Sequence, residues 1–210
     1  MNFFIALLTM ALSINAYGTS SDKKFSASFR SGLITGMGLT PGIELSYLKS
    51  QYQFSTMYYK ADLKNISSFA SDVELDISDR ISHNLFIAHM RCFLSESFYF
   101  ALGLGQRHYN MAYESHNKID SSFVSLDIKS TSIVGYYTIG NMWILENGLL
   151  IGFDWLGQVR PINHKFEIKT QTSENDSDLD TLQGLINDHV KELGQTSTLV
   201  AFLLNLGWSF

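Results

Sequence analysis

Seven ionisable side chains share one property: each lies on the polar face of a segment whose other face is apolar. Side chains placed in this way can form a gated pore or a proton-dependent site, or they can form salt bridges that fill a narrow interior. We favour the salt-bridge network, with Glu44 and Asp154 paired to arginines, although the sequence does not specify the partners. The seven residues are Arg30, Glu44, His89, Arg91, Arg107, Asp154 and Arg160.

The six histidines allow a test for hydrolytic chemistry. A nucleophilic serine needs a histidine beside it, and a His-x-Ser pattern along a strand places both groups on one face. None of the histidines is followed two positions later by serine; those positions hold Leu85, Arg91, Asn110, Lys118, Phe166 and Lys191. We therefore predict no enzyme, no metal site and no cofactor. The single cysteine, Cys92, is interpreted as a small apolar residue.

The last segment of the chain shows a strict two-residue alternation, which is typical of a strand. From Thr198 onward the even positions are mostly apolar, and the odd positions are mostly small or polar. An apolar outer face that ends in aromatic residues is typical of the closing strand of a transmembrane barrel. The even positions that end the chain are Leu204, Leu206, Trp208 and Phe210.

The composition limits the function classes. Aromatic residues make up 13% of the chain, charged residues only 17%, and the formal net charge is −5. The negative charge argues against nucleic acid as a partner. One cysteine cannot form an internal disulfide. No stretch of the mature chain has the roughly 20 apolar residues of a membrane helix.

The amino-terminal segment predicts export. Phe3–Ile14 is an apolar run of signal-peptide length, and Ala16 and Gly18 are small residues suited to a cleavage site. We divide the chain into a signal peptide, 1–18, and a barrel, 19–210, with cleavage after Ala16 as an alternative. A buried amino-terminal helix is the other interpretation, because no Lys or Arg precedes the apolar run.

Alternating segments predict eight antiparallel strands in an all-β, up-and-down transmembrane barrel. The short connections Ser50-Gln51, Ser95–Ser97 and Glu146–Gly148 would lie on the periplasmic side, and three of the four outer connections are long. Ten strands remain an alternative if Val73–Ile77 or Phe123–Lys129 forms a separate hairpin. The predicted strands are Phe25–Gly36, Ile43–Lys49, Tyr52–Leu63, Ser82–Leu94, Phe98–Tyr113, Thr131–Leu145, Leu149–Arg160 and Thr198–Phe210.

The longest predicted connection, residues 163–195, contains a second periodicity. Ser177–Asp180 resembles a helix capping box, apolar residues from Leu179 to Leu193 recur at helical spacing, and Gly194 can end a helix. We predict one amphipathic helix in this outer loop. It would either pack over the barrel mouth or contact a surface partner.

These patterns resemble the small eight-stranded outer-membrane barrel family typified by the membrane domains of OmpA, OmpX and OmpW-type proteins. The resemblance covers Phe25–Phe210 and includes the Asn147-Gly148 hairpin and the Leu204-x-Leu206-x-Trp208-x-Phe210 ending. It implies an outer-membrane location, contact with membrane lipids, and transient recognition of that ending by the barrel-assembly machinery.

The predicted function is an integral outer-membrane protein with a filled, narrow lumen that acts structurally or through its outer loops. Two alternatives remain: a channel for a small or hydrophobic solute, and a lipid-modifying enzyme. A secreted, soluble ligand-binding barrel is the remaining alternative, and it would require the aromatic face to point inward.

Overall fold

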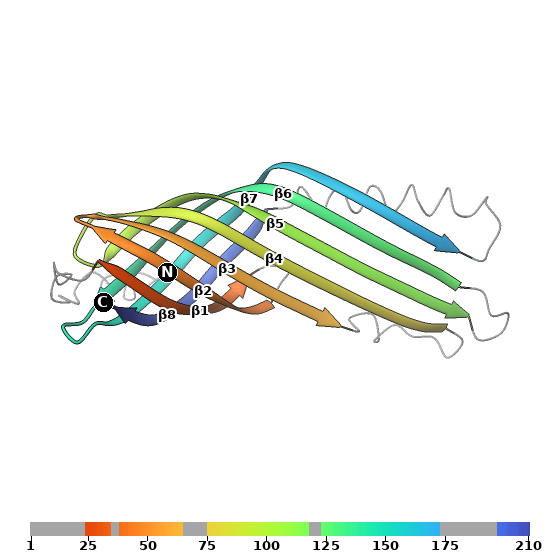
Figure 1. Cartoon of the computed structure of the whole chain (residues 1–210), viewed down its shortest axis with the longest axis horizontal. Coiled ribbons are helices and arrows are strands. Elements are labelled where there is room, and N and C mark those ends of the chain that lie inside the picture. Colours follow the sequence, from red (N-terminus) through yellow and green to blue (C-terminus); the bar gives the residue numbers. More distant parts are fainter. Residues whose placement is uncertain (1–23, 35–37, 65–74, 118–122, 173–196) are drawn as a thin grey trace, which may run out of the picture.

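The computed structural model describes residues 24–34, 38–64, 75–117, 123–172 and 197–210. Eight strands follow one another around a closed antiparallel barrel in which β1 pairs with both β2 and β8 (Figure 1). The predicted fold class and strand number are therefore confirmed. The strands are β1 (Phe25–Ile34), β2 (Gly38–Lys49), β3 (Tyr52–Lys64), β4 (Leu75–Phe93), β5 (Phe98–Asn117), β6 (Phe123–Ile144), β7 (Leu149–Thr172) and β8 (Thr198–Ser209).

One end of the barrel carries the three short turns and the closure of the sheet. Phe25 and Phe210 exchange backbone hydrogen bonds of 3.1 and 2.8 Å there. In the β6–β7 turn the Asn147 side chain accepts a hydrogen bond from the backbone N–H of Leu149, and Gly148 has φ 95°. A positive φ is favourable for glycine, which explains the Asn-Gly hairpin. We call this end the turn end.

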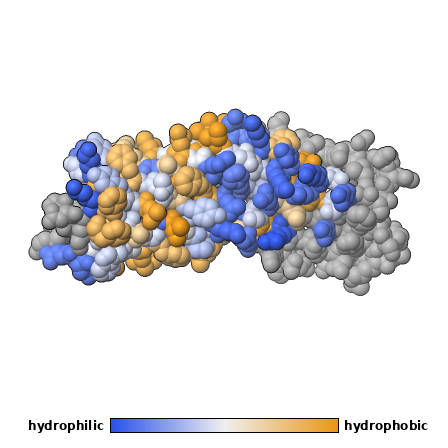
Figure 2. Space-filling model, in the orientation of Figure 1, coloured by the Kyte–Doolittle hydropathy of each residue, from blue (hydrophilic) through white to orange (hydrophobic). Residues whose placement is uncertain are grey.

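All eight strands carry exposed large apolar side chains, which form a belt near the turn end. Figure 2 shows this belt on one face of the barrel. On β3 it runs from Tyr52 to Tyr58, and on β4 it begins at Phe86 and continues toward the turn. Beyond the belt the outward residues on these strands become polar, as at Lys60 and Asn84. An apolar exterior is the reverse of a soluble barrel, whose outer surface meets water.

β4 and β6 are each continuous, so the ten-strand alternative is wrong. The predicted loop 163–195 also needs correction, because β7 does not end at Arg160 but runs on to Thr172, paired with β6 throughout. The predicted helix within that loop and the predicted signal peptide, 1–18, lie outside the described residues.

Both prolines of the chain lie inside strands, where the sequence suggested turns. Pro41 pairs with Ser31 on β1, one residue beyond the last β2–β3 pair at Gly42. Pro161 pairs with Val134 on β6, two residues beyond the last β7–β8 pair at Val159. Proline cannot donate a backbone hydrogen bond, so a strand tolerates it where one neighbour is missing. Each proline marks a place where the closed barrel opens into a free-standing edge of the described strands.

Bulges on β7 and β8 reverse the inward and outward positions along the strand. On β7 one extra residue is Trp155, because Ile139 pairs with Leu156 while Gly140 pairs with Asp154, and a second is Ile162, which lies between the paired residues Pro161 and Asn163. Between these two bulges Val159 points inward and is buried, and Arg160 points outward. The predicted interior placement of Arg160 is therefore wrong, because a bulge shifts the side chains that follow it, up to the next bulge, to the other face.

The bulge on β8 lies opposite, at Phe202, which has a positive φ of 54°. The apolar face predicted as continuous from Thr198 to Phe210 is divided there: Thr198 and Val200 face the interior, and Leu203 is fully buried. Gly32 of β1 allows this arrangement, because a Cβ at Gly32 would lie 2.7 Å from the Leu203 backbone.

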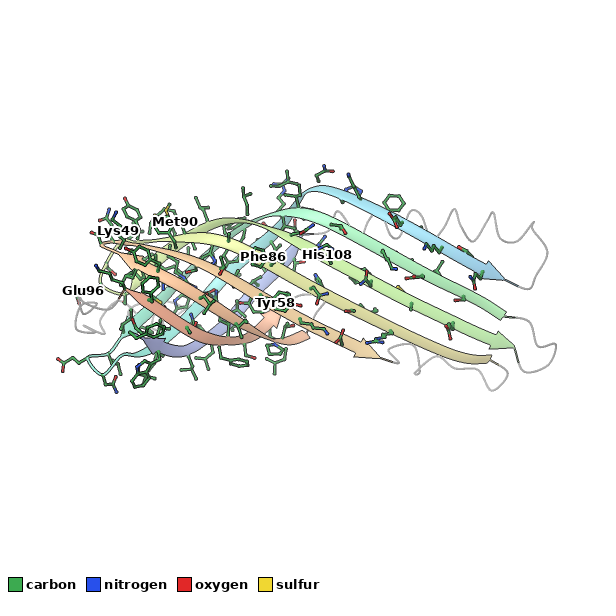
Figure 3. All side chains as sticks on the ribbon, in the orientation of Figure 1. Lys49, Tyr58, Phe86, Met90, Glu96 and His108 are labelled. Carbon is green, nitrogen blue, oxygen red and sulfur yellow. The ribbon has the colours of Figure 1, made fainter. Side chains whose placement is uncertain are left out.

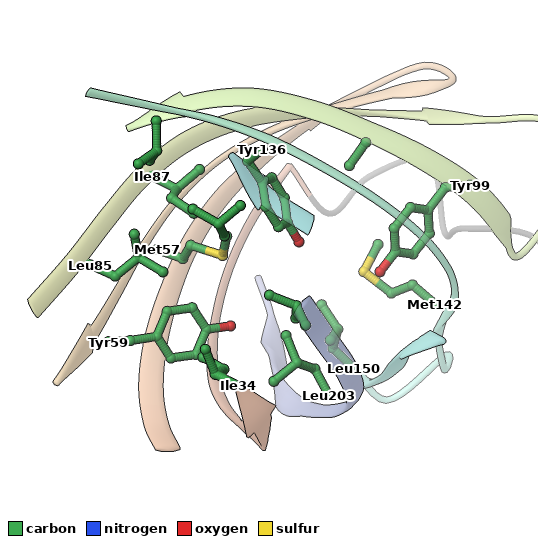
Figure 4. Packing of buried hydrophobic residues seen from close by; sticks show 14 of the residues in the cluster. Ile34, Met57, Tyr59, Leu85, Ile87, Tyr99, Tyr136, Met142, Leu150 and Leu203 are labelled. Carbon is green, nitrogen blue, oxygen red and sulfur yellow. The ribbon is translucent and has the colours of Figure 1, made fainter. Parts of the chain in front are cut away.

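The barrel interior holds more apolar side chains than the sequence suggested (Figure 4). One layer lies on the side away from the turns and includes Tyr59, Leu85, Val134 and Val200. A second layer lies near the turn end and is formed by Tyr99, Ala101, Met142, Ile144 and Leu150. A layer of charged residues lies between them, so three layers of side chains occupy the described barrel interior.

Four strands extend well beyond the others and form a sheet that projects from the barrel (Figure 1). β4 to β7 have 19, 20, 22 and 24 residues, whereas β1, β2, β3 and β8 have 10, 12, 13 and 12. At roughly 3.3 Å per residue, Arg160–Thr172 alone extends about 40 Å. We call this part the projecting sheet and define it as Leu75–Asp79, Tyr113–Asn117, Phe123–Ser130 and Asn163–Thr172.

Candidate functional site: a charged network in the barrel interior

Glu44 is the centre of the charged layer. Arg91 donates two hydrogen bonds of 2.5 and 2.8 Å to the Glu44 carboxylate, and Arg30 donates a third of 2.6 Å. Ser46 donates a fourth hydrogen bond of 3.0 Å. The three charged side chains are at most 1% exposed. Charge-assisted bidentate contacts in a dry interior are geometrically specific, so these residues fix β1, β2 and β4 relative to one another.

Asp154 balances the second arginine charge. It accepts hydrogen bonds from Arg30 and from the hydroxyl groups of Tyr99 and Tyr136. Arg91 also lies over the Tyr99 ring, 5.0 Å from its centroid, and donates a hydrogen bond of 2.8 Å to Gln53. The network therefore contains two arginines and two carboxylates, and its formal charges cancel.

His89 lies against this network without joining it through a hydrogen bond. Its Nε2 is 4.0 Å from a Glu44 oxygen, and its ring packs edge-on against Tyr136 at 5.4 Å. Neither ring nitrogen has a hydrogen-bond partner among the described residues. Burying a polar group without a partner is costly, so His89 is a poorly satisfied position in the layer.

A second polar group lies nearer the open end of the barrel, beyond the apolar belt. Arg107 donates a hydrogen bond of 3.1 Å to Thr198, and His83 packs edge-on against Tyr109. Burial, and after it the positive charge of Arg107, lower the pKa of His83 to about 4. His83 is therefore neutral at physiological pH.

The structure places six of the seven predicted interior residues inside the barrel. The buried residues are Arg30, Glu44, His89, Arg91, Arg107 and Asp154. Four of them form one connected network: Arg30, Glu44, Arg91 and Asp154. Arg160 does not belong to the interior, because the Trp155 bulge turns it outward. The sequence analysis missed the two tyrosine donors, Tyr99 and Tyr136, although Tyr99 has the same alternation as Ala101 on β5.

The proposed assembly signal lies on the outer face, where another protein can reach it. Leu204, Leu206, Trp208 and Phe210 are all exposed on the outer side of β8. Their recognition by an assembly factor remains a prediction.

The chemistry available in the network is electrostatic and structural. Every carboxylate in it is paired with arginine, and its one serine donor, Ser46, bonds a carboxylate rather than a histidine. Within the described ranges no group of three His, Cys, Asp or Glu side chains could hold a metal ion. In the same ranges no helix is long and apolar enough to cross a membrane.

Comparisons with known proteins identify the fold and no more. No protein-family model matches the sequence, and no curated protein matches it. Among solved structures, the chain is similar to a major outer membrane protein from Thermus thermophilus, with 10% identity and a TM-score of 0.52. That match covers 90% of this chain and 100% of the other.

Two further solved structures are similar at lower scores. CarO of Acinetobacter baumannii has 10% identity and a TM-score of 0.49, over 91% of this chain and 100% of that one. Ail of Yersinia pestis has 11% identity and a TM-score of 0.46, over 90% and 97%. The chain thus has the fold of the small eight-stranded outer-membrane barrels.

Proposed function

We propose that this protein resides in the outer membrane, where a sealed barrel anchors the projecting sheet for contacts at the cell surface. The observation that carries the proposal is the difference in strand length between β4–β7 and the other four strands. Strands that end at the membrane surface need only about 9–11 residues. The additional residues of β4–β7 serve no purpose in spanning the membrane.

The outer face of the projecting sheet is suited to water. It carries alternating charges, including the exposed Asp127–Lys129 pair at 3.4 Å and the exposed residues Lys165, Glu167 and Lys169. The opposite face is apolar around Leu126 and Ile128. A sheet with one charged face and one buried apolar face supports a folded, water-exposed element rather than a continuation of the membrane belt.

The filled lumen supports an anchoring role over the channel alternative. A permeating solute would have to displace the Arg30–Glu44–Arg91–Asp154 network and both apolar layers. The paired carboxylates likewise support a non-enzymatic role. Planar-bilayer recordings test the channel directly: we expect no steady conductance from purified protein, and stable single-channel steps would contradict a sealed barrel.

The surface role is tested by shortening the projecting sheet without opening the barrel. Deleting Tyr113–Leu126 and joining Ala112 to Asp127 through Asn-Gly preserves a paired position, because Ala112 pairs with Asp127. The truncated protein should still fractionate with the outer membrane and change its gel mobility on heating. Cells expressing it should attach to protein-coated glass less than cells expressing the full chain.

The control for this deletion is a variant that changes the sequence of the projecting sheet but not its length. Exchanging Asp127 and Lys129 conserves length, charge and strand pairing, so attachment that depends on the sheet itself should persist. Equal attachment by the full and truncated proteins would contradict the surface role. Recovery of the full chain in the soluble periplasmic fraction would contradict the membrane location. Mass analysis of the mature amino terminus tests cleavage after Gly18.

A further inference from the structure

The outer surface of the barrel has a groove where two small residues lie side by side. Thr56 of β3 pairs directly with Ala88 of β4, and both side chains point outward. On the turn side of this pair lie Phe54 and Met90, and on the other side lie Tyr58 and Phe86. The small pair thus leaves a gap beside Phe54 and Met90, and all four residues line one groove. Tyr58, Phe86 and Met90 are labelled in Figure 3.

Residues of the neighbouring strands β2 and β5 line the sides of the groove. Leu45 of β2 pairs with Thr56, and Leu104 of β5 pairs with Ala88. The resulting groove has a volume of about 810 Å³ and continues past Leu45 to Tyr47 and Phe25. This volume is within the range of small-molecule sites. Its wall is nearly all apolar, and it lies in the apolar belt.

The groove reaches positive charge at the turn end. Tyr47 and Lys49 are alternate residues on the outer face of β2, so Lys49 follows the groove in the same row of side chains. Lys24 precedes Phe25, and its backbone carbonyl accepts a 2.7 Å hydrogen bond from Leu48. Both lysines are exposed. An apolar groove that leads to two cations matches an acyl chain joined to an anionic headgroup.

We propose that this groove binds one acyl chain of an anionic diacyl phospholipid, with the headgroup phosphate near Lys49 and Lys24. The proposal rests on the proposed membrane location, because only an inserted barrel exposes the belt to lipid. The small Thr56–Ala88 pair gives the acyl chain a depression in the belt. The contacts are dispersion and apolar burial along the groove, and charge attraction at its end.

The test is native mass spectrometry of the full-length protein refolded into vesicles of phosphatidylglycerol and phosphatidylethanolamine and then extracted in mild detergent. Wild-type protein should retain one phosphatidylglycerol. Ala88→Phe fills the gap and should reduce the lipid-bound fraction about tenfold, as expected when several methylene contacts are lost. Lys49→Gln should retain lipid but lose the preference for the anionic headgroup.

Leu156→Phe is the matched control, because it adds an aromatic ring to the exposed outer face of β7, away from β3 and β4. This variant should retain lipid as the wild type does. Equal retention by Ala88→Phe would overturn the proposal, as would complete absence of lipid from wild type or the mass of a second protein copy. Heat-dependent gel mobility is measured on every sample. Folded protein without bound lipid contradicts only the groove, whereas protein that never inserts contradicts the proposed membrane location.

Discussion

Strands β4 to β7 belong both to the closed barrel and to the projecting sheet, but their side chains meet different surroundings in the two regions. In the barrel, every interior position faces other strands, so opposite charges such as Glu44 and Arg91 can be buried together as an ion pair. In the projecting sheet, the ion pair Asp127–Lys129 is exposed to water on one face. A buried ion pair is costly to break, whereas an exposed ion pair contributes little to the free energy of unfolding. The contrast therefore indicates that closing the sheet into a barrel makes the charged residues important for stability.

The edges of the two regions differ as well. The barrel has none, because β1 pairs with β8. Among the described strands, β7 has no partner on its β8 side beyond Val159, and β4 has none on its β3 side beyond Arg80. Unpaired edges are sites where other chains can add strands, and charged residues such as Lys165 and Lys169 limit unspecific pairing.

The largest predicted effect comes from breaking the barrel network at its centre. Glu44→Gln removes one of the two negative charges and leaves the arginine pair uncompensated, which should reduce the free energy of unfolding by about 3–5 kcal/mol. Urea unfolding in lipid vesicles, followed by tryptophan fluorescence, measures this change. The double variant Glu44→Gln, Arg91→Met restores charge balance and should recover part of the loss. A single variant within 1 kcal/mol of wild type would contradict the buried network.

The next largest effect concerns the close contact between Gly32 of β1 and the bulged part of β8 near Leu203. Gly32→Val places a side chain where the Leu203 backbone already lies, so we expect a loss of about 3 kcal/mol in unfolding free energy from overpacking. Gly135→Val is the control, because the closest atom to a Cβ there is 3.7 Å away. If the two variants unfold at the same urea concentration, the close approach of β1 and β8 is not a constraint.

A smaller effect is expected from acidification at the open end of the barrel. His83 has a folded-state pKa of about 4, below its ordinary value of about 6.5. The unfolded chain therefore binds a proton first, and the stability contribution, present above about pH 6.5, is lost as the pH falls toward 4. Relative to His83→Gln, wild type should lose about 2 kcal/mol between pH 7 and pH 4.5. Parallel pH profiles for the two proteins would exclude His83 as the cause.

The smallest effect should come from the projecting sheet. Lys129→Gln breaks an exposed ion pair, which should change the free energy of unfolding by less than about 1 kcal/mol. The same urea titration, run at low and high salt, provides the measurement. A loss as large as that of Glu44→Gln would show that the projecting sheet is as strongly coupled to folding as the barrel.

The sequence alone determined the outward and inward alternation wherever a strand is regular. On β4 the predicted interior residues His89 and Arg91 both lie inside, because side chains alternate with a period of two along a strand. The short turns were also predictable, since Asn147-Gly148 and its neighbours favour tight reversals. These features depend on residues close together in the chain.

Only the tertiary structure decided where that alternation changes and which charges meet. Trp155 and Phe202 give no local signal that a bulge will follow; the shift exists because β6, β7, β8 and β1 must pair in one closed sheet. The same closure moves Arg160 outward and brings Asp154 to Arg30, which lie 124 positions apart. Pairing across such distances depends on shear and register around the whole barrel, and no local pattern contains that information.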